Sequence, residues 1–160
     1  MDLKHGNRFL SALAAFAGIV LIIGISGCDN NKTGQSQNID LGGTYWYLTS
    51  FESGALELPV IPFTKITLFF KTDATGLYGN DSVNLYGSNY VLNGDEITLS
   101  DFVTTAMSPP LFPPGLDQQE ELYLKLLEKS ERVSSSENKL IIHCLGGELF
   151  YSRDTVYKYP

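Results

Sequence analysis

Apolar and polar side chains alternate through much of the chain after Thr44, and this period of two residues constrains the fold most strongly. Segments 64–70, 96–99 and 139–145 each carry apolar residues at every second position. These residues are Ile66, Leu68, Phe70, Ile97, Leu99, Leu140, Ile142 and Cys144. Alternation of this kind predicts β-strands with one buried face.

Glycine-containing turn sequences separate several of these segments. Asn93-Gly94 lies between 90–92 and 95–99, and Leu145-Gly146-Gly147-Glu148 precedes 149–151. Asn-Gly favours a tight hairpin because both residues tolerate positive φ. Strands joined by short turns, each with one polar face, predict an antiparallel sheet that curls or closes on itself.

One segment has the period of a helix instead. Asp117 and Glu120 fit a capping box, in which Asp117 accepts from the first-turn amides and Glu120 reaches back. The apolar residues that follow at helical spacing are Leu122, Tyr123, Leu126 and Leu127. The proline-rich stretch 109–115 is a stiff lead-in. We expect this single helix to pack across an open side of the sheet.

The N-terminus has the three parts of an export signal. Lys4 and Arg8 precede an apolar run from Phe9 to Ile25, and Ser26-Gly27 stands directly before Cys28. Small residues before a cysteine resemble the lipobox of bacterial lipoproteins. We therefore expect cleavage before Cys28 and acylation of its thiol by diacylglycerol.

An uncleaved transmembrane anchor is the alternative, because the apolar run is close to the ~20 residues of a spanning helix. The polar residues Asp29-Asn30-Asn31 directly after the cysteine favour the lipoprotein. Both alternatives place the rest of the chain outside the cytoplasm, in the cell envelope. Asp29 favours the inner membrane by the sorting rule of enteric lipoproteins, but the choice between inner and outer membrane stays open.

The expected processing divides the chain into a signal peptide (1–27), a lipidated cysteine with a flexible polar tether (28–43) and one folded domain (44–160). The formal net charge of −7 argues against a nucleic-acid partner, which needs a basic face. Anionic lipid repels such a domain, so the acyl chains are the expected membrane anchor.

The residue types of an active site are scarce after residue 27. His143 and Cys144 are adjacent, and neighbours in a strand point to opposite faces, so they form no dyad. A single histidine leaves a zinc site short of its usual ligands. Residues 134–136 are three serines without the context of a nucleophile elbow, and we interpret them as a loop. We expect no catalytic residues, no metal, no cofactor and no enzymatic activity.

Aromatic residues offer a candidate binding surface, because rigid amphipathic rings are typical of such surfaces. The candidates are Trp46, Tyr78, Tyr86, Tyr90 and Phe112. For Trp46 we favour the alternative that it plugs the barrel. For Asn84 we expect a structural role in bonding turn backbone.

Four segments occur in an order that resembles one known family. They are GTYWYL (43–48), NLYGSNY (84–90), TTAM (104–107) and QEELY (119–123). Together they resemble the META-domain family of HslJ-like lipoproteins. Many members have cysteines where this chain has Val83 and Ser108, so the resemblance implies no disulfide here. It implies a small, partly open antiparallel β-barrel closed by one α-helix, without catalysis, in proteins of envelope stress, drug tolerance and secretion.

Two functions are compatible with these observations. In the first, the domain is a membrane-anchored binding or envelope-stress module whose barrel mouth or cleft takes an acyl chain or apolar peptide, with a gap beside Leu68 and Leu126. In the second, it is an interaction or assembly factor for envelope or secretion components. The second would use the tyrosines or the 109–114 loop to contact an envelope protein.

Overall fold

The computed structural model describes residues 39–108, 110 and 113–153. Cys28, the signal peptide and Phe112 lie outside these residues. The described elements are β1 (Tyr45–Ser53), β2 (Leu56–Pro59), β3 (Thr67–Phe70), β4 (Gly76–Asn80), β5 (Leu85–Asn93), β6 (Glu96–Thr104), α1 (Leu116–Leu127), β7 (Ser130–Ser135), β8 (Lys139–Cys144) and β9 (Gly147–Ser152).

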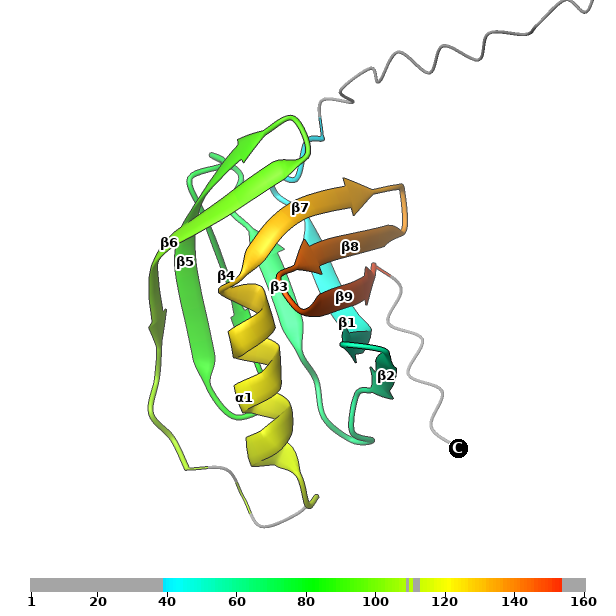
Figure 1. Ribbon diagram of the computed structural model, residues 1–160. Coiled ribbons are helices and arrows are strands. Elements are labelled where there is room, and N and C mark those ends of the chain that lie inside the picture. Colours follow the sequence, from blue (N-terminus) through cyan, green and yellow to red (C-terminus); the bar gives the residue numbers. More distant parts are fainter. Residues whose placement is uncertain (1–38, 109, 111–112, 154–160) are drawn as a thin grey trace, which may run out of the picture. The chain divides into compact units, whose positions relative to one another are not determined.

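Eight of the strands form a barrel in which each strand pairs with the next (Figure 1). Antiparallel neighbours follow the order β1-β3-β4-β5-β6-β7-β8-β9, and β9 pairs back onto β1. β2 lies outside this ring. It pairs with β1 over Ser50–Ser53, beyond the stretch Tyr45–Tyr47 on which β3 pairs. The predicted antiparallel barrel with one helix is confirmed.

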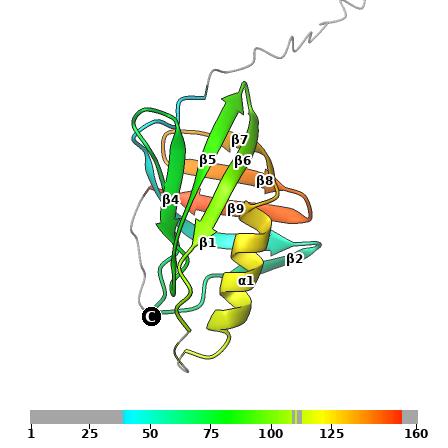
Figure 2. The same cartoon turned by 90° about the vertical axis from the view of Figure 1, so that its left-hand side faces the viewer.

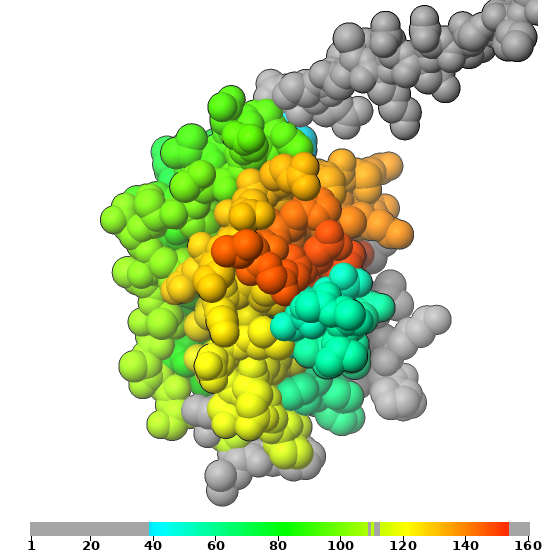
Figure 3. Space-filling view, viewed as in Figure 1, coloured from blue at the N-terminus to red at the C-terminus, as the bar shows by residue number. Residues whose placement is uncertain are grey.

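The seam between β6 and β7, where the two strands pair, is short. α1 covers the side of the barrel on which the two strands diverge (Figures 1 and 2). Glu96 and Arg132 form the bridge of this seam, and the Val133 amide donates to the Asp95 carbonyl at 2.8 Å. In the space-filling view, α1 (yellow) fills the surface between β6 (green) and β9 (red-orange) (Figure 3). The helix therefore completes a barrel that its strands leave partly open.

Both predicted hairpins are present. Gly94, with φ 67°, opens the turn between β5 and β6, and Gly146, with φ 106°, lies in the turn between β8 and β9. The first turn is Gly94-Asp95, one residue later than expected, because Asn93 stays extended and pairs with Glu96. Glycine supplies the positive φ in both turns at no steric cost.

The barrel core consists of the inward side chains of the strands and one face of the helix. The predicted alternation is confirmed for the buried residues Ile66, Leu68, Phe70, Ile97, Leu140, Ile142 and Cys144. On the helix, Tyr123, Leu126 and Leu127 are buried in the same core. Burial of so much apolar surface is the main stabilising contribution to the fold.

The predicted capping box is wrong. The residue before α1 is Gly115, with φ 87°, and it makes no side-chain cap among the described residues. Asp117 lies inside the first turn, and Glu120 does not reach back to the helix start. Glu120 instead accepts a hydrogen bond from Asn84, 36 residues earlier in the chain. The capping-box motif is local in the sequence, so it gives no information on Asn84, the distant residue that Glu120 binds.

Residues 39–43 belong to the folded body rather than to the tether, which corrects the predicted range 28–43. Leu41 is 1% exposed and packs in the core. Its carbonyl accepts from the Thr44 amide at 3.1 Å and from Thr44 Oγ1 at 2.6 Å. The Gly43 amide donates to the Phe70 carbonyl at 2.9 Å, which ties this segment to β3.

Candidate functional site

Side chains of the strands and of α1 form one core cluster inside the barrel. Leu68 and Leu126, beside which a gap was expected, are both buried in the core. Aromatic rings occupy the space between α1 and the strands, and the rings of Tyr86 and Tyr123 meet edge to face at 5.7 Å. Leu68 and Leu126 therefore pack into the core, and the pocket that the described residues form lies elsewhere.

Three buried tyrosine hydroxyls form a chain through this core. Tyr86 Oη donates to the Thr67 carbonyl at 2.6 Å and lies 2.6 Å from Tyr123 Oη. Tyr123 Oη lies 3.1 Å from Tyr151 Oη. Burial raises the pKa of all three hydroxyls well above the ordinary value for tyrosine. They remain protonated at physiological pH, and their role is to satisfy one another in the core.

Three of the predicted surface residues, Trp46, Tyr86 and Tyr90, are buried in the core. Trp46 is 0% exposed, its Nε1 donates to Thr44 Oγ1 at 2.7 Å, and the Arg153 guanidinium carbon lies 4.6 Å from its ring centroid. The structure thus agrees with the favoured interpretation of Trp46 as a barrel plug. Trp46 and Tyr86 therefore contribute no exposed ring to the predicted binding surface.

Asn84 joins three elements at the start of β5. Its Nδ2 donates to Glu120 Oε1 of α1 at 2.5 Å and to the Met107 carbonyl at 3.2 Å. Its Oδ1 accepts from Thr105 Oγ1 at 2.8 Å and from the Met107 amide at 2.7 Å. The amide is fully used in linking this turn, the segment after β6 and the helix. This is the structural role expected for Asn84, extended to more partners.

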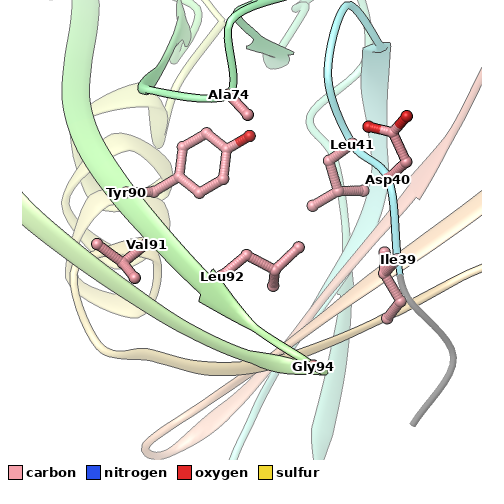
Figure 4. A pocket seen from close by; sticks show the side chains of 8 residues that line it. All are labelled: Ile39, Asp40, Leu41, Ala74, Tyr90, Val91, Leu92 and Gly94. Atoms are coloured by element: carbon pink, nitrogen blue, oxygen red, sulfur yellow. The ribbon is translucent and has the colours of Figure 1, made fainter.

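A pocket of about 490 Å³ lies at the other end of β5 (Figure 4). Its lining residues are Ile39, Asp40, Leu41, Ala74, Tyr90, Val91, Leu92 and Gly94. Leu41 and Leu92 extend into it from opposite sides, and the Tyr90 ring projects from β5 below Ala74 (Figure 4). The volume is within the ~300–1,000 Å³ typical of small-molecule sites. Of the predicted residues, Tyr90 is the one that this pocket uses.

Carboxylates surround the apolar walls of this mouth pocket. The pKa of Tyr90 is raised by burial and then by the negative charges of Asp40 and Asp73. Asp40 Oδ1 accepts from the Gly42 amide at 3.0 Å. Hydrogen bonds from Thr75, through its hydroxyl at 2.7 Å and its amide at 3.1 Å, lower the pKa of Asp73. The pocket therefore combines the aliphatic side chains of Ile39, Leu41 and Leu92 with polar groups and nearby carboxylates.

Tyr78, the fourth predicted residue, belongs to an outer aromatic row formed by Tyr45, Phe69 and Tyr78 on β1, β3 and β4. Tyr45 is 44% and Tyr78 48% exposed. The ring centroids of Tyr45 and Phe69 are 6.2 Å apart, and those of Phe69 and Tyr78 are 4.9 Å apart. The residue opposite Tyr78 on β5 is Gly87, which adds no side chain at that position.

Ser134, His143 and Glu148 form a hydrogen-bonded chain on the outer face of β7, β8 and β9. Ser134 Oγ lies 3.2 Å from His143 Nε2, and His143 Nδ1 lies 2.7 Å from Glu148 Oε1. Ser134 is part of β7, which corrects the interpretation of 134–136 as a loop. Acyl transfer by such a triad also requires oxyanion donors and exclusion of water. Ser134 is exposed, and none of the three residues lines the mouth pocket.

Cys144 has the environment of a structural thiol. It is buried, and burial raises its pKa to about 12, which leaves little of the reactive thiolate near neutral pH. The part of the chain that the structure describes contains no group of three or more His, Cys, Asp or Glu placed to hold a metal ion. Within the same residues, no helix has the length and apolar character needed to cross a bilayer.

Solved structures share this fold. A protein from Burkholderia xenovorans, solved by NMR, is 22% identical, with a TM-score of 0.61 over 72% of this chain and 84% of that chain. A second NMR structure is 18% identical, with a TM-score of 0.55 over 70% and 90%. A crystal structure of a DUF4847 family protein from Bacteroides vulgatus is 10% identical, with a TM-score of 0.52 over 71% and 94%. At these identities the similarity concerns the fold alone.

The structure is a small β-barrel with one helix packed over its side and a pocket at one mouth. The sequence matches the META domain over residues 39–155. The chain therefore belongs to the META-domain family, as the resemblance of its motifs predicts. A search of the curated proteins finds no match.

Proposed function

We propose that this protein is a lipid-anchored, extracytoplasmic binding module that holds an apolar chain, with an acyl chain as the ligand, in the mouth pocket. The observation that carries the proposal is the pocket itself, in which Leu41 and Leu92 extend from opposite sides into about 490 Å³. Each methylene group that moves from water to an apolar wall lowers the free energy of binding by about 0.8 kcal/mol. The proposed module acts without catalysis.

The position of the pocket in the chain supports a ligand of membrane origin. Ile39 and Leu41 line the pocket, and ten residues, 29–38, separate Ile39 from the predicted acylated Cys28. Ten residues span at most about 35 Å when fully extended. The proposed anchor would therefore keep the mouth pocket within reach of lipid, in either envelope membrane.

Filling the pocket is expected to weaken ligand binding. Leu92→Trp places an indole in the pocket, so we expect the affinity for the apolar fluorophore N-phenyl-1-naphthylamine to fall at least about tenfold, or ~1.4 kcal/mol. Leu85→Trp is the matched control, because Leu85 is an exposed leucine on the same strand and does not line the pocket. Fluorescence titration measures both. Equal binding by the wild type and the two variants would contradict the proposal.

A second candidate function is recognition of an envelope or secretion protein through the outer aromatic row. The exposed rings of Tyr45 and Tyr78 favour it, because tyrosine is enriched in protein interfaces. Phe112, together with residues 109 and 111 of the proline-rich loop, lies outside the described residues. The second function would replace the first if Tyr78→Ala removed in-membrane cross-links to a partner while Leu92→Trp left ligand binding unchanged.

A further inference from the structure

Asp81 is a fully buried carboxylate with one oxygen left over. It lies in the turn between β4 and β5 and is 0% exposed. Its Oδ1 accepts from the Val83 amide at 2.9 Å and from the Asn84 amide at 2.6 Å. Its Oδ2 has no hydrogen-bond partner among the described residues. A buried carboxylate oxygen without a hydrogen-bond partner costs free energy. A cation or a hydrogen-bond donor beside the oxygen would remove this cost.

The carboxyl group of Glu120 meets Asp81 from the helix. Glu120 Oε1 accepts from Asn84 Nδ2, and the Asn84 backbone amide donates to Asp81 Oδ1, so Asn84 links the two carboxyl groups. Asp81 lies close enough to Glu120 to raise the pKa of Glu120. Burial raises the pKa of Glu120 most. The hydrogen bond from Asn84 opposes this effect, and Asp81 and then Asp117 raise the pKa further.

The groups facing this carboxyl pair supply no compensating charge. Asp117 on α1 is a further acid, and the hydroxyls of Tyr86 and Tyr123 are buried and protonated, with Asp81 among the causes of their raised pKa. Within the described ranges, neither Asp81 nor Glu120 forms an ion pair with a basic side chain. Asp81 is fully buried and Glu120 is partly buried, and two neighbouring carboxyl groups in such a site ionise together only at a cost in free energy.

We propose that Asp81 and Glu120 share one proton, and that this proton fastens α1 to the turn between β4 and β5. Glu120 carries the proton and donates it to Asp81 Oδ2, the buried oxygen that has no partner among the described residues, while Asp81 Oδ1 accepts from two backbone amides. The arrangement is a pH-sensitive latch. When Glu120 loses the proton, two negative charges face each other and the helix is repelled from the turn.

The turn itself is suited to opening. Ser82, directly after Asp81, holds φ at 91°, a conformation that costs a residue other than glycine of order 1–3 kcal/mol. Its buried Oγ also lacks a hydrogen-bond partner among the residues described. The strained turn is therefore held by its bonds to Glu120 and to its neighbours, and loss of the shared proton removes one of these restraints.

The sign of the pH dependence follows from the raised pKa of Glu120. Because the folded state binds this proton more tightly than the unfolded state does, the latch contributes its full stability below the ordinary glutamate pKa of 4.5. This contribution is lost as the pH rises through the raised pKa of the folded state. The latch is thus closed in acid and weakened toward neutral pH.

The test compares the full chain with Glu120→Gln, which keeps the shape but cannot ionise. We expect the wild-type free energy of unfolding to fall with rising pH above 4.5, and Glu120→Gln to lose up to about one proton of this linkage. Glu121→Gln, the exposed neighbouring glutamate, is the control and should retain the wild-type slope. Urea unfolding at several pH values measures all three proteins.

A second measurement tests the shared proton even if Glu120→Gln does not fold. In the wild type, the ¹³C resonance of the Glu120 carboxyl should titrate with a midpoint above 4.5. A midpoint at or below that value overturns the proposal, as does a Glu120→Gln slope equal to that of Glu121→Gln. If a cation held the carboxyl pair instead, EDTA would lower the free energy of unfolding and Ca²⁺ would restore it. This result would also overturn the proposal.

Discussion

Gly79→Ala is expected to destabilise the domain by about 3 kcal/mol, because an added methyl group has no room and its neighbours cannot move. Gly79 lies on β4, opposite Leu68 on β3 and Tyr86 on β5. A Cβ atom there would fall far inside van der Waals contact with the Thr67 carbonyl oxygen and the Tyr86 hydroxyl. These two atoms are bound to each other at 2.6 Å, so relief would break a buried hydrogen bond.

Gly87→Ala provides the matched control for Gly79→Ala. Gly87 is a strand glycine on β5, and a Cβ atom there would lie 3.5 Å from the Leu77 carbonyl oxygen, an ordinary contact. We expect this variant to stay within about 0.5 kcal/mol of the wild type. Urea unfolding followed by the fluorescence of Trp46, the one tryptophan of the chain, measures both. Similar losses in the two variants would contradict the close packing around Gly79.

Tyr123→Phe is expected to cost about 2 kcal/mol, because it removes the central hydroxyl of the buried chain and leaves a polar neighbour unpaired. Tyr86 Oη would retain the Thr67 carbonyl, whereas Tyr151 Oη would lose its contact with Tyr123. Phenylalanine fills the same volume, so the loss would reflect the hydrogen bonds and not a cavity.

The exposed ring of Tyr78 provides the matched control for Tyr123→Phe, because the same substitution there removes a hydroxyl at the surface. Tyr78→Phe removes a hydroxyl from a half-exposed ring and should change the free energy of unfolding by less than about 0.5 kcal/mol. Urea midpoints at an unchanged m-value separate a stability effect from a change in the unfolded state. Equal midpoints for Tyr123→Phe and Tyr78→Phe would show that the buried hydroxyl chain contributes little.

Much of the sheet could be predicted because its information is local. Alternation identifies Ile66, Leu68 and Phe70 as inward residues of one strand, and Gly94 and Gly146 mark hairpin turns. Closure of the barrel is different, because it depends on pairing between β1 and β9 at the two ends of the domain. No local pattern specifies which distant edge a strand will find.

The candidate site was harder to predict, for two physical reasons. Residue type alone does not say which face of a strand a ring occupies, yet parity along β5 places Tyr86 and Tyr90 on the inward face with Ser88. Leu41 was missed because its polar neighbours resemble a linker, although its burial places it in the core. The contact between Asn84 and Glu120 is long-range and leaves no periodic signal.

The most direct test of the central claim is photo-cross-linking of the acylated chain in vesicles that contain palmitate with a diazirine group on its tail. The account predicts that labelled peptides come from the pocket-lining segments 39–41 and 90–94, and that Leu92→Trp removes this label while Leu85→Trp keeps it. Labelling that avoids these two segments, or that Leu92→Trp leaves unchanged, would contradict an acyl chain in the mouth pocket.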